Sequence, residues 1–507
     1  MGFGAVDAGI VGVYLLGVTL AGSLAGRKLK STQDYFLAGR RAPWWLSAFS
    51  IVATETSTLT FVAVPGIAYA GNFTFLQVAA GFLLGRILVA WWMVPAYMKG
   101  DLQTSYELLQ TRLGTRARRS ASGVFCLTRL LGDGVRLFSA CVVFKEVLAW
   151  MFGPWQGNEL AAVAVVGGLT LVYTFAGGMR AVLWTDLVQL FLYLGGALVA
   201  VLVAAAAVPG GLGGVVESAL QAGKLQWLNA DLGKTFFDGY SLLGGLLGGA
   251  FLSLASHGTD QLIVQRLLSC KGVRSARVAV VASGVLVLFQ MAFFLFVGLT
   301  LWAFYRAAPG GPPPFARPDD VFPHFLVTNL PSGLSGLIVA AAFAAAMSTL
   351  SGSLNSLASA TVNDFYRPLT RDRHPEGRYL RAGRWATLVW GLLLMGVAVP
   401  ARGIHGLLDA GLGIAGITSG GVLGLFLLSK WKGKAPGGVA GMWAAILVCG
   451  ILWAGPRLHW TWVPPFHWTW FTPIGTAVVF LVSAMAAVTT KVLDPRKSQK
   501  NHDLPPV

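Results

Sequence analysis

The stretch Ala53-Thr54-Glu55-Thr56-Ser57-Thr58-Leu59-Thr60, followed by Pro65-Gly66, places five hydroxyl groups and a carboxylate inside the apolar run 43–70. Polar side chains at membrane depth are costly, so they usually mark a functional site. The β-branched threonines and the Pro-Gly pair favour an unwound turn, whose backbone carbonyls can coordinate a small cation. We therefore predict a discontinuous transmembrane helix. The alternative, hydroxyls that bond back to their own helix, accounts for only one or two of the five.

The rest of the chain is also typical of a membrane protein. Of its 507 residues, 55% are apolar and 12% are charged, whereas a soluble domain carries about a quarter charged residues. This composition excludes an ordinary soluble enzyme. A helix of about 20 apolar residues crosses the hydrocarbon layer, and we predict an all-α polytopic membrane protein with about 13 transmembrane helices. The predicted spans are 5–26, 43–70, 73–98, 119–152, 158–177, 180–208, 239–262, 275–306, 331–364, 380–400, 405–429, 435–455 and 466–490.

The basic residues predict the orientation of these spans. The net charge is +17, but the Lys and Arg residues lie between the apolar runs rather than in one patch, so no nucleic-acid partner is expected. Of the 38 Lys and Arg residues, 28 fall in one alternating set of loops and six in the other. Because basic loops stay in the cytoplasm, we predict an outside N-terminus, an inside C-terminus and a multi-pass location in the plasma membrane, specifically a bacterial inner membrane.

A second polar cluster lies in the run 331–364, which contains Ala344-Ala345-Ala346-Met347-Ser348-Thr349-Leu350-Ser351-Gly352-Ser353. Ala345, Ser348, Thr349 and Gly352 share one helix face by their spacing. Small residues let a neighbouring helix approach, and two hydroxyls offer oxygen ligands of the kind that hard cations prefer. Close packing with interhelical hydrogen bonds is the alternative interpretation.

A second interruption is predicted in the run 239–262, where Gly244-Gly245 and Gly248-Gly249 precede Ser253-Leu254-Ala255-Ser256-His257-Gly258-Thr259-Asp260-Gln261. Two interrupted helices five spans apart are what an inverted repeat of five helices produces. Asp186 lies near the inner end of its span. Asp133 and Arg136 are one helical turn apart, and a simple i, i+3 ion pair is one interpretation of them.

Three motifs in order make the chain similar to the sodium:solute symporter family over residues 5 to 430. They are Asp34-Tyr35-Phe36-Leu37-Ala38-Gly39-Arg40, Gly258-Thr259-Asp260-Gln261 with Gln265-Arg266, and Ala346-Met347-Ser348-Thr349-Leu350-Ser351. The resemblance implies a LeuT-like five-plus-five inverted repeat within one transmembrane domain, 1–491. In it, 5–26 is a leading helix, 43–429 the ten-helix core and 435–490 two trailing helices, before a short cytoplasmic tail, 492–507.

The resemblance also implies ion sites. The main sodium site would use the backbone carbonyls of Ala53, Thr56 and Ala345 with the hydroxyls of Ser348 and Thr349. Some members bind a second sodium, for which Asp186, Ser348 and Ser351 match, whereas Gly352 stands where a further serine is expected. Glu55 stands where proline-type members carry an aspartate.

The resemblance also bears on the solute contacts. Arg136 could pair with a substrate carboxylate, as in similar sialic acid transporters. Ser253, Ser256 and Gln290 replace the Asn, Tyr and Lys of sugar-transporting members, which disfavours a hexose held by that contact set. The candidate substrate-binding residues are Glu55, Ser57, Thr60, Phe75, Gln77, Arg136, Ser253, Ser256, His257 and Gln290.

The predicted function is sodium-coupled import of a small organic solute, a carboxylate such as sialic acid or a monocarboxylate, with sodium as the co-transported ion. A sugar or a proline-type amino acid is the alternative solute, and a membrane sensor without transport is the alternative class. An enzyme is not expected, because His257, His405, His459 and His467 are scattered without a metal-binding spacing. The oligomeric state stays open, with a monomer sufficient for transport.

Overall fold

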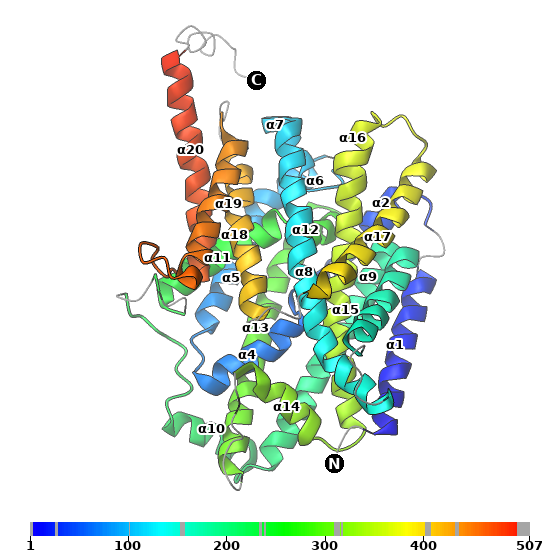
Figure 1. Cartoon of the computed structure of the whole chain (residues 1–507), viewed down its shortest axis with the longest axis vertical. Coiled ribbons are helices and arrows are strands. Elements are labelled where there is room, and N and C mark those ends of the chain that lie inside the picture. The colour runs from blue at the N-terminus through cyan, green and yellow to red at the C-terminus, as the bar shows by residue number, and fades with distance from the viewer. Residues whose placement is uncertain are drawn as a thin grey trace.

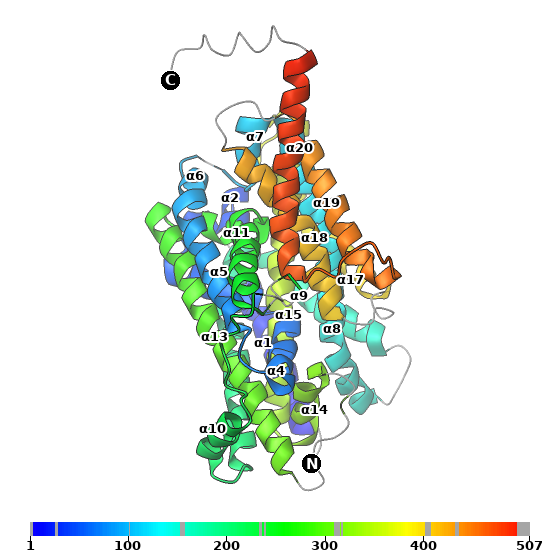
Figure 2. The same ribbon diagram turned by 90° about the vertical axis from the view of Figure 1, so that its left-hand side faces the viewer.

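The described part of the computed structural model is helical throughout. It covers residues 4–493 except 26–28, 101, 153–157, 233–235, 238–239, 309–314, 316–317, 401–406 and 431–435. Within these residues the extended contacts are limited to one isolated bridge between Ala42 and Cys270. Most long helices run along one axis, and the start of α1 and the end of α20 lie at opposite ends of it (Figures 1 and 2). This confirms the all-α class. The predicted tail is 492–507, and its residues after Leu493 lie outside the described part.

The described helices follow the apolar runs in order. They are α1 (Ala5–Ala25), α2 (Thr32–Leu37), α3 (Trp44–Glu55), α4 (Thr58–Ala70), α5 (Leu76–Leu88), α6 (Val94–Met98), α7 (Glu107–Leu113), α8 (Thr115–Phe152), α9 (Asn158–Ala206), α10 (Gly211–Gln221), α11 (Gly249–Gly258), α12 (Gln261–Leu268), α13 (Val273–Ala307), α14 (Val321–Thr328), α15 (Leu334–Ala360), α16 (Arg367–Leu369), α17 (Glu376–Ala398), α18 (Leu407–Leu428), α19 (Gly438–Ala454) and α20 (Phe471–Leu493). Short π-helical turns precede α6, α11 and α16, at Val89–Met93, Gly244–Gly248 and Thr361–Tyr366.

Six continuous helical stretches among the described residues are long and apolar enough to cross a membrane. They are Ala5–Ala25, Leu76–Met98, Leu160–Ala206, Val273–Ala307, Leu334–Leu369 and Trp468–Thr489. Gly413–Leu428 and Gly438–Ala454 are shorter apolar helices. The predicted spans 43–70 and 239–262 fall outside this set, and each contains a helix break, the first near its middle and the second near its end.

Both interruptions predicted from the sequence are present. The first separates α3 from α4 at Thr56 and Ser57, whose backbone angles are not helical. Pro65, which also favoured a departure from the helix, instead lies inside α4. The second separates α11 from α12 at Thr259 and Asp260. A third irregularity, Gly178 with φ +54° inside α9, falls between the predicted spans 158–177 and 180–208.

Glycines bring α5 and α11 into close contact, and these two helices lie side by side in Figure 2. A Cβ atom at Gly81 would lie 2.5 Å from the carbonyl oxygen of Gly245, and one at Gly249 would lie 2.5 Å from that of Val78. Gly248 packs in the same way against the backbone of Thr469. The glycine-rich turn therefore serves packing within the chain, because any side chain there would separate the two backbones.

Helix α15 is the central element of the bundle. Almost all of its residues are buried, and it packs against α9, α8 and α1, with α3 and α12 at its middle. Helices α18, α19 and α20 pack together on one side. This arrangement places the polar face of α15 beside the break between α3 and α4, which is where the site forms.

Candidate functional site

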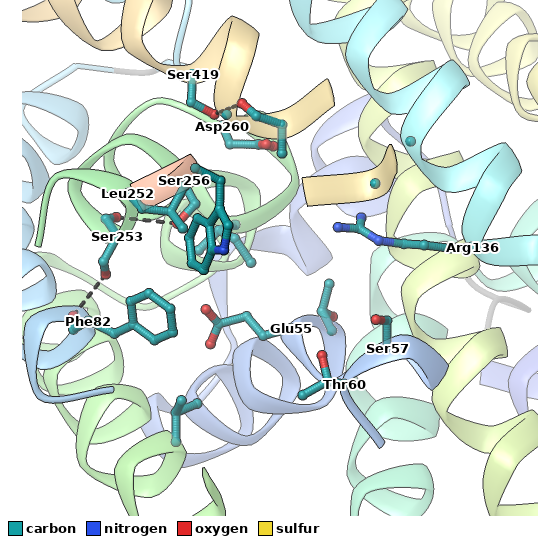
Figure 3. A pocket seen from close by; sticks show the side chains of 18 of the residues that line it. Glu55, Ser57, Thr60, Phe82, Arg136, Leu252, Ser253, Ser256, Asp260 and Ser419 are labelled. Carbon is teal, nitrogen blue, oxygen red and sulfur yellow. Dashed lines mark hydrogen bonds between the residues drawn. The ribbon is translucent and has the colours of Figure 1, made fainter. Parts of the chain in front are cut away.

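A cavity of about 250 Å³ lies between the two interrupted helices (Figure 3). The break between α3 and α4 forms one wall, and α11 with the start of α12 forms another. Helices α5, α8, α13 and α18 complete it. Aromatic and aliphatic side chains line much of the surface, and charged or hydroxylated side chains enter at a few places. Such a cavity, apolar with a few convergent polar groups, is typical of a small-molecule site.

At the end of α3, backbone carbonyls lose the N–H donors that they would have in a continuous helix. In a continuous helix the Ser57 N–H would donate to the Ala53 carbonyl, but here it donates to the Glu55 carbonyl at 2.9 Å. Thr56 leaves the helix with φ −79° and ψ 80°. The last carbonyls of any helix lack intrahelical donors, so this end can supply oxygen ligands deep inside the bundle. The side chain of Gln290, on α13, donates to the Thr56 hydroxyl at 2.5 Å.

The polar face of α15 meets this helix end. The hydroxyl of Thr349 lies 3.2 Å from the Thr54 carbonyl and 3.3 Å from the Ala345 carbonyl. The Ser348 hydroxyl, one residue earlier, points to Asp186 on α9 and donates to it at 2.6 Å. The five residues of the predicted main sodium site thus come from the two facing elements, α3 with its break and α15. In the structure Thr349 contacts α3, whereas Ser348 contacts α9.

Asp186 has a partner that the sequence interpretation missed. Arg266 on α12 donates to Asp186 at 3.0 Å, both side chains are fully buried, and Ser50 donates to the same carboxylate oxygen as Arg266 does. Ser351 instead donates to the Ser348 carbonyl at 3.1 Å. A Cβ atom at Gly352 would lie 2.7 Å from the Arg266 guanidinium. The glycine at the position of the expected serine thus makes room for Arg266, and the second sodium stays a prediction.

Two arginines of α8 reach the cavity wall, and both bind carboxylates. Arg136 donates to Asp133 at 2.6 Å, which is the predicted i, i+3 ion pair, and a quarter of its side chain is exposed. Asp133 also accepts from Ser353 on α15 at 2.5 Å. Arg129 pairs with Asp260 at the start of α12 and lies 3.5 Å from Asp133. These contacts connect α8 with α15 and with the second helix break.

Glu55, the last residue of α3, enters the cavity with two partners behind it. One carboxylate oxygen lies 2.5 Å from Arg86 on α5, and the other lies 3.0 Å from the imidazole Nε2 of His257 on α11. Arg86 is fully buried and also donates to Ser283 on α13 at 3.1 Å. The sequence singled out Glu55 and His257 separately. Only the fold shows that they contact each other.

A second cavity of about 10 Å³, room for a single water molecule, lies between Arg136 and Thr349. Ser57 and Asp133 also line it. Ser57 and Arg136 face both cavities. The small cavity therefore lies between Arg136 on α8 and the hydroxyl-bearing face of α15.

Eight of the ten predicted substrate-binding residues line the large cavity. They are Glu55, Ser57, Thr60, Phe75, Arg136, Ser253, Ser256 and His257. The other two, Gln77 and Gln290, are not among the lining residues and bond to neighbouring segments. Gln77 donates to the Tyr240 carbonyl at 2.6 Å and thereby holds the segment before α11, and Gln290 donates to Thr56 at the helix break.

Several further residues line the cavity that the sequence did not indicate, among them Phe82, Arg129, Tyr240, Asp260, Met291, Ser419 and Trp468. Tyr240 and Trp468 lie near the ends of predicted spans, where aromatic residues are common in any membrane protein, so their type carried no signal. Arg129 offered one, because a charge inside a predicted span needs a partner.

Comparison with known proteins identifies the class. The model of the sodium:solute symporter family matches residues 35–445. The sodium/sialic acid symporter NanT of Aliivibrio fischeri is 31% identical over 89% of this chain and 88% of its own, and SiaT of Proteus mirabilis is 28% identical over 89% of each. The solved outward-open structure of a sodium-coupled sialic acid symporter superposes with a TM-score of 0.82 at 25% identity and covers 96% of this chain and 98% of its own.

These matches and the two interrupted helices define a sodium-coupled membrane transporter of the LeuT-like fold. The chain belongs to the sodium:solute symporter family. Sodium is the co-transported ion, as the resemblance implied, and a solute is the cargo.

Proposed function

We propose that this chain imports an organic carboxylate together with sodium and that Arg136 binds the carboxylate. The observation that carries the proposal is the place of Arg136, which faces the large cavity and, across the small one, Thr349. A guanidinium has a planar fork that fits a carboxylate with two hydrogen bonds. Its Nη1 is engaged by Asp133, while its buried Nε has no partner among the described residues.

The relatives support this solute class. Two of them transport sialic acid, which is a carboxylate, and a further relative, 28% identical over 85% of this chain, is the sodium-coupled monocarboxylate transporter 2 of Bos taurus. A sugar or a proline-type amino acid is the alternative solute. Proline would also bring a carboxylate, whereas a neutral sugar would bring no anion to the cavity side of Arg136.

For the main sodium site we propose the carbonyls of Ala53, Thr56 and Ala345 and the hydroxyls of Ser348 and Thr349. Two contacts support this set. The Ser57 N–H donates to Glu55 and not to the Ala53 carbonyl, and the Thr349 hydroxyl contacts the end of α3. One sodium entering at a membrane potential of 100 mV contributes about 2.3 kcal/mol before any concentration gradient. We propose one sodium for each cycle, because Arg266 already neutralises Asp186. The predicted second site at Asp186, Ser348 and Ser351 is the alternative to this proposal.

We further propose the predicted arrangement in the membrane: a leading helix, the ten-helix core, two trailing helices and an outside N-terminus. The short helices α7 and α16, in basic loops, lie at the end of the bundle where α20 ends, and α10 and α14 lie at the other end (Figure 1). One chain contains both interrupted helices, so a monomer would suffice for transport. The bacterial relatives support a bacterial inner membrane.

The test is a thermal-shift assay of the purified protein with sialic acid, lactate, proline and glucose, each in NaCl and in KCl. We expect stabilisation by at least one carboxylate in sodium only. Stabilisation by glucose alone would favour the sugar alternative. Sodium-independent binding of every solute would contradict symport.

A further inference from the structure

The large cavity has charged groups on two of its sides. In Figure 3 the guanidinium of Arg136 extends from α8, and the carboxylate of Glu55 points away from it, toward Phe82 on α5. About a fifth of the Glu55 side chain and a quarter of the Arg136 side chain are exposed. The other charged residues that line the cavity, Arg129 and Asp260, pair with each other. The proposed function uses Arg136 and gives Glu55 no role.

The partners of Glu55 hold its carboxylate in one orientation. Arg86 is fully buried and does not line the cavity, so it approaches from behind. The His257 ring is fixed in turn, because its Nδ1 lies 2.9 Å from the Ser256 hydroxyl and 3.2 Å from the Ser253 carbonyl. Each carboxylate oxygen thus has one partner in the protein. A carboxylate accepts about four hydrogen bonds, which leaves acceptor capacity on the cavity side.

The surroundings make that acceptor selective. Val64, Phe75 and Met291 line the same cavity and offer no hydrogen-bond donor to Glu55. A solute with an apolar tail would displace water from the carboxylate without replacing its hydrogen bonds, and an unpaired buried polar group is expensive. A site built to hydrogen-bond a solute group rejects analogues that lack the group.

We propose that Glu55 accepts hydrogen bonds from the solute, so that the transported class is a carboxylate bearing hydroxyl or ammonium groups away from its carboxylate end. Arg136 binds the carboxylate of the solute, and Glu55 accepts hydrogen bonds from its hydroxyl or ammonium groups. The inference rests on the proposed function and narrows it. Plain aliphatic acids are excluded, because they would bring an anion and no donor to a wall that already carries a carboxylate.

A series of six-carbon probes tests the inference on the wild-type protein. Gluconate carries a carboxylate and hydroxyls, 6-aminohexanoate a carboxylate and an ammonium group, hexanoate only the carboxylate, and sorbitol only hydroxyls. In NaCl, with sialic acid as a further hydroxylated acid, we expect the best donor-bearing acid to bind at least tenfold more tightly than hexanoate. Hexanoate binding as tightly as the best of them would overturn the inference and leave the proposed function intact. Binding of sorbitol without any acid would instead contradict the proposed function.

The paired variant Glu55→Gln with Arg86→Met removes both charges, because Glu55→Gln alone would leave Arg86 buried without an anion. We expect it to lose at least tenfold in affinity for the best donor-bearing acid and to keep or gain affinity for hexanoate. The matched control is Glu376→Gln with Arg367→Gln, an ion pair of 2.6 Å outside the cavity, and it should keep the wild-type order. A folded Glu55→Gln/Arg86→Met variant with the wild-type order would refute the role of Glu55. If that variant does not fold, the wild-type series decides.

Discussion

The hydroxyl of Thr349 on α15 donates to the backbone carbonyl of Thr54 at the end of α3, at 3.2 Å. This hydrogen bond joins the two elements that the proposed sodium site requires. They are the end of α3, where carbonyls lack helical donors, and the hydroxyl-bearing face of α15. It also crosses between helices that lie almost 300 residues apart in the chain. A sodium ion that gathers oxygens from both elements would fix their separation, which is how ion binding can prepare the adjacent solute cavity.

Removing either hydroxyl of the proposed sodium site should weaken sodium binding. We expect Thr349→Ala and Ser348→Ala each to raise the sodium concentration for half-maximal uptake by about tenfold, equivalent to about 1.4 kcal/mol. Sodium titration of uptake in proteoliposomes measures this. Thr300→Ala, which removes a hydroxyl that donates to the Phe296 carbonyl within α13, is the control and should behave as wild type. Unchanged sodium dependence in both Thr349→Ala and Ser348→Ala would refute the site.

The pair of Asp186 and Arg266 predicts the number of sodium ions. Because Arg266 occupies the space that Gly352 leaves free, we expect a sodium Hill coefficient near one in the wild type. Asp186→Asn should leave that coefficient unchanged and destabilise the protein by about 3–5 kcal/mol, the usual cost of breaking a buried ion pair. Thermal unfolding in detergent measures the loss. A wild-type coefficient near two that falls to one in a stable Asp186→Asn variant would establish the second sodium site instead.

The charge on Arg136 predicts solute specificity. Arg136→Lys keeps the charge but loses the planar fork, so we expect uptake of an acidic solute to fall by about 30-fold or more, equivalent to about 2 kcal/mol. Sodium binding should change little. The rival interpretation, in which Arg136 only neutralises Asp133, predicts near-normal transport by the double variant Asp133→Asn with Arg136→Gln. Equal transport of a neutral solute by wild type and Arg136→Gln would also favour that rival.

Glu107 on α7, in a loop between predicted spans, predicts a pH dependence of stability. Burial raises the pKa of Glu107 from 4.5 to about 7, although Arg118 lies 3.2 Å away. Between these values the folded protein keeps a proton that the unfolded chain has lost, so stability falls as pH rises from about 4.5 to 7 and then levels off. We expect Glu107→Gln to abolish this fall in thermal unfolding scans at pH 5, 6, 7 and 8. Glu217→Gln, at an exposed position of α10, is the control, and an unchanged pH profile in Glu107→Gln would contradict the assignment.

Local sequence was sufficient to place both interrupted helices. Hydroxyls and a carboxylate inside an apolar run are costly in lipid wherever the rest of the chain lies, so the breaks near Thr56 and Asp260 were predictable. The residue that causes the first break was not predictable. Pro65 is accommodated inside α4, whereas the preceding helix, α3, ends ten residues earlier at Glu55. The proline therefore does not mark the turn that unwinds.

The partners of the charges were harder to predict. Arg136 with Asp133 is one turn apart, so the spacing was sufficient to anticipate the pair. Arg266 with Asp186 and Arg86 with Glu55 join residues 80 and 31 positions apart. No periodicity connects such positions, since contact between them depends on how α12 and α5 pack. For the same reason the sequence did not predict that Gln77 and Gln290 donate hydrogen bonds to the Tyr240 carbonyl and the Thr56 hydroxyl. Their role in solute binding stays a prediction.

The sequence by itself determined the helical membrane class, the two breaks and the hydroxyl-bearing face of α15, because hydropathy and helix periodicity are local properties. Only the tertiary structure decided which charges meet. It pairs Asp186 with Arg266 and turns Glu55 between Arg86 and His257, and it exposes part of Arg136 to the cavity. The physical reason is that a buried charge must find its partner in three dimensions, and the helix packing that brings the partner has no signature in the neighbouring residues.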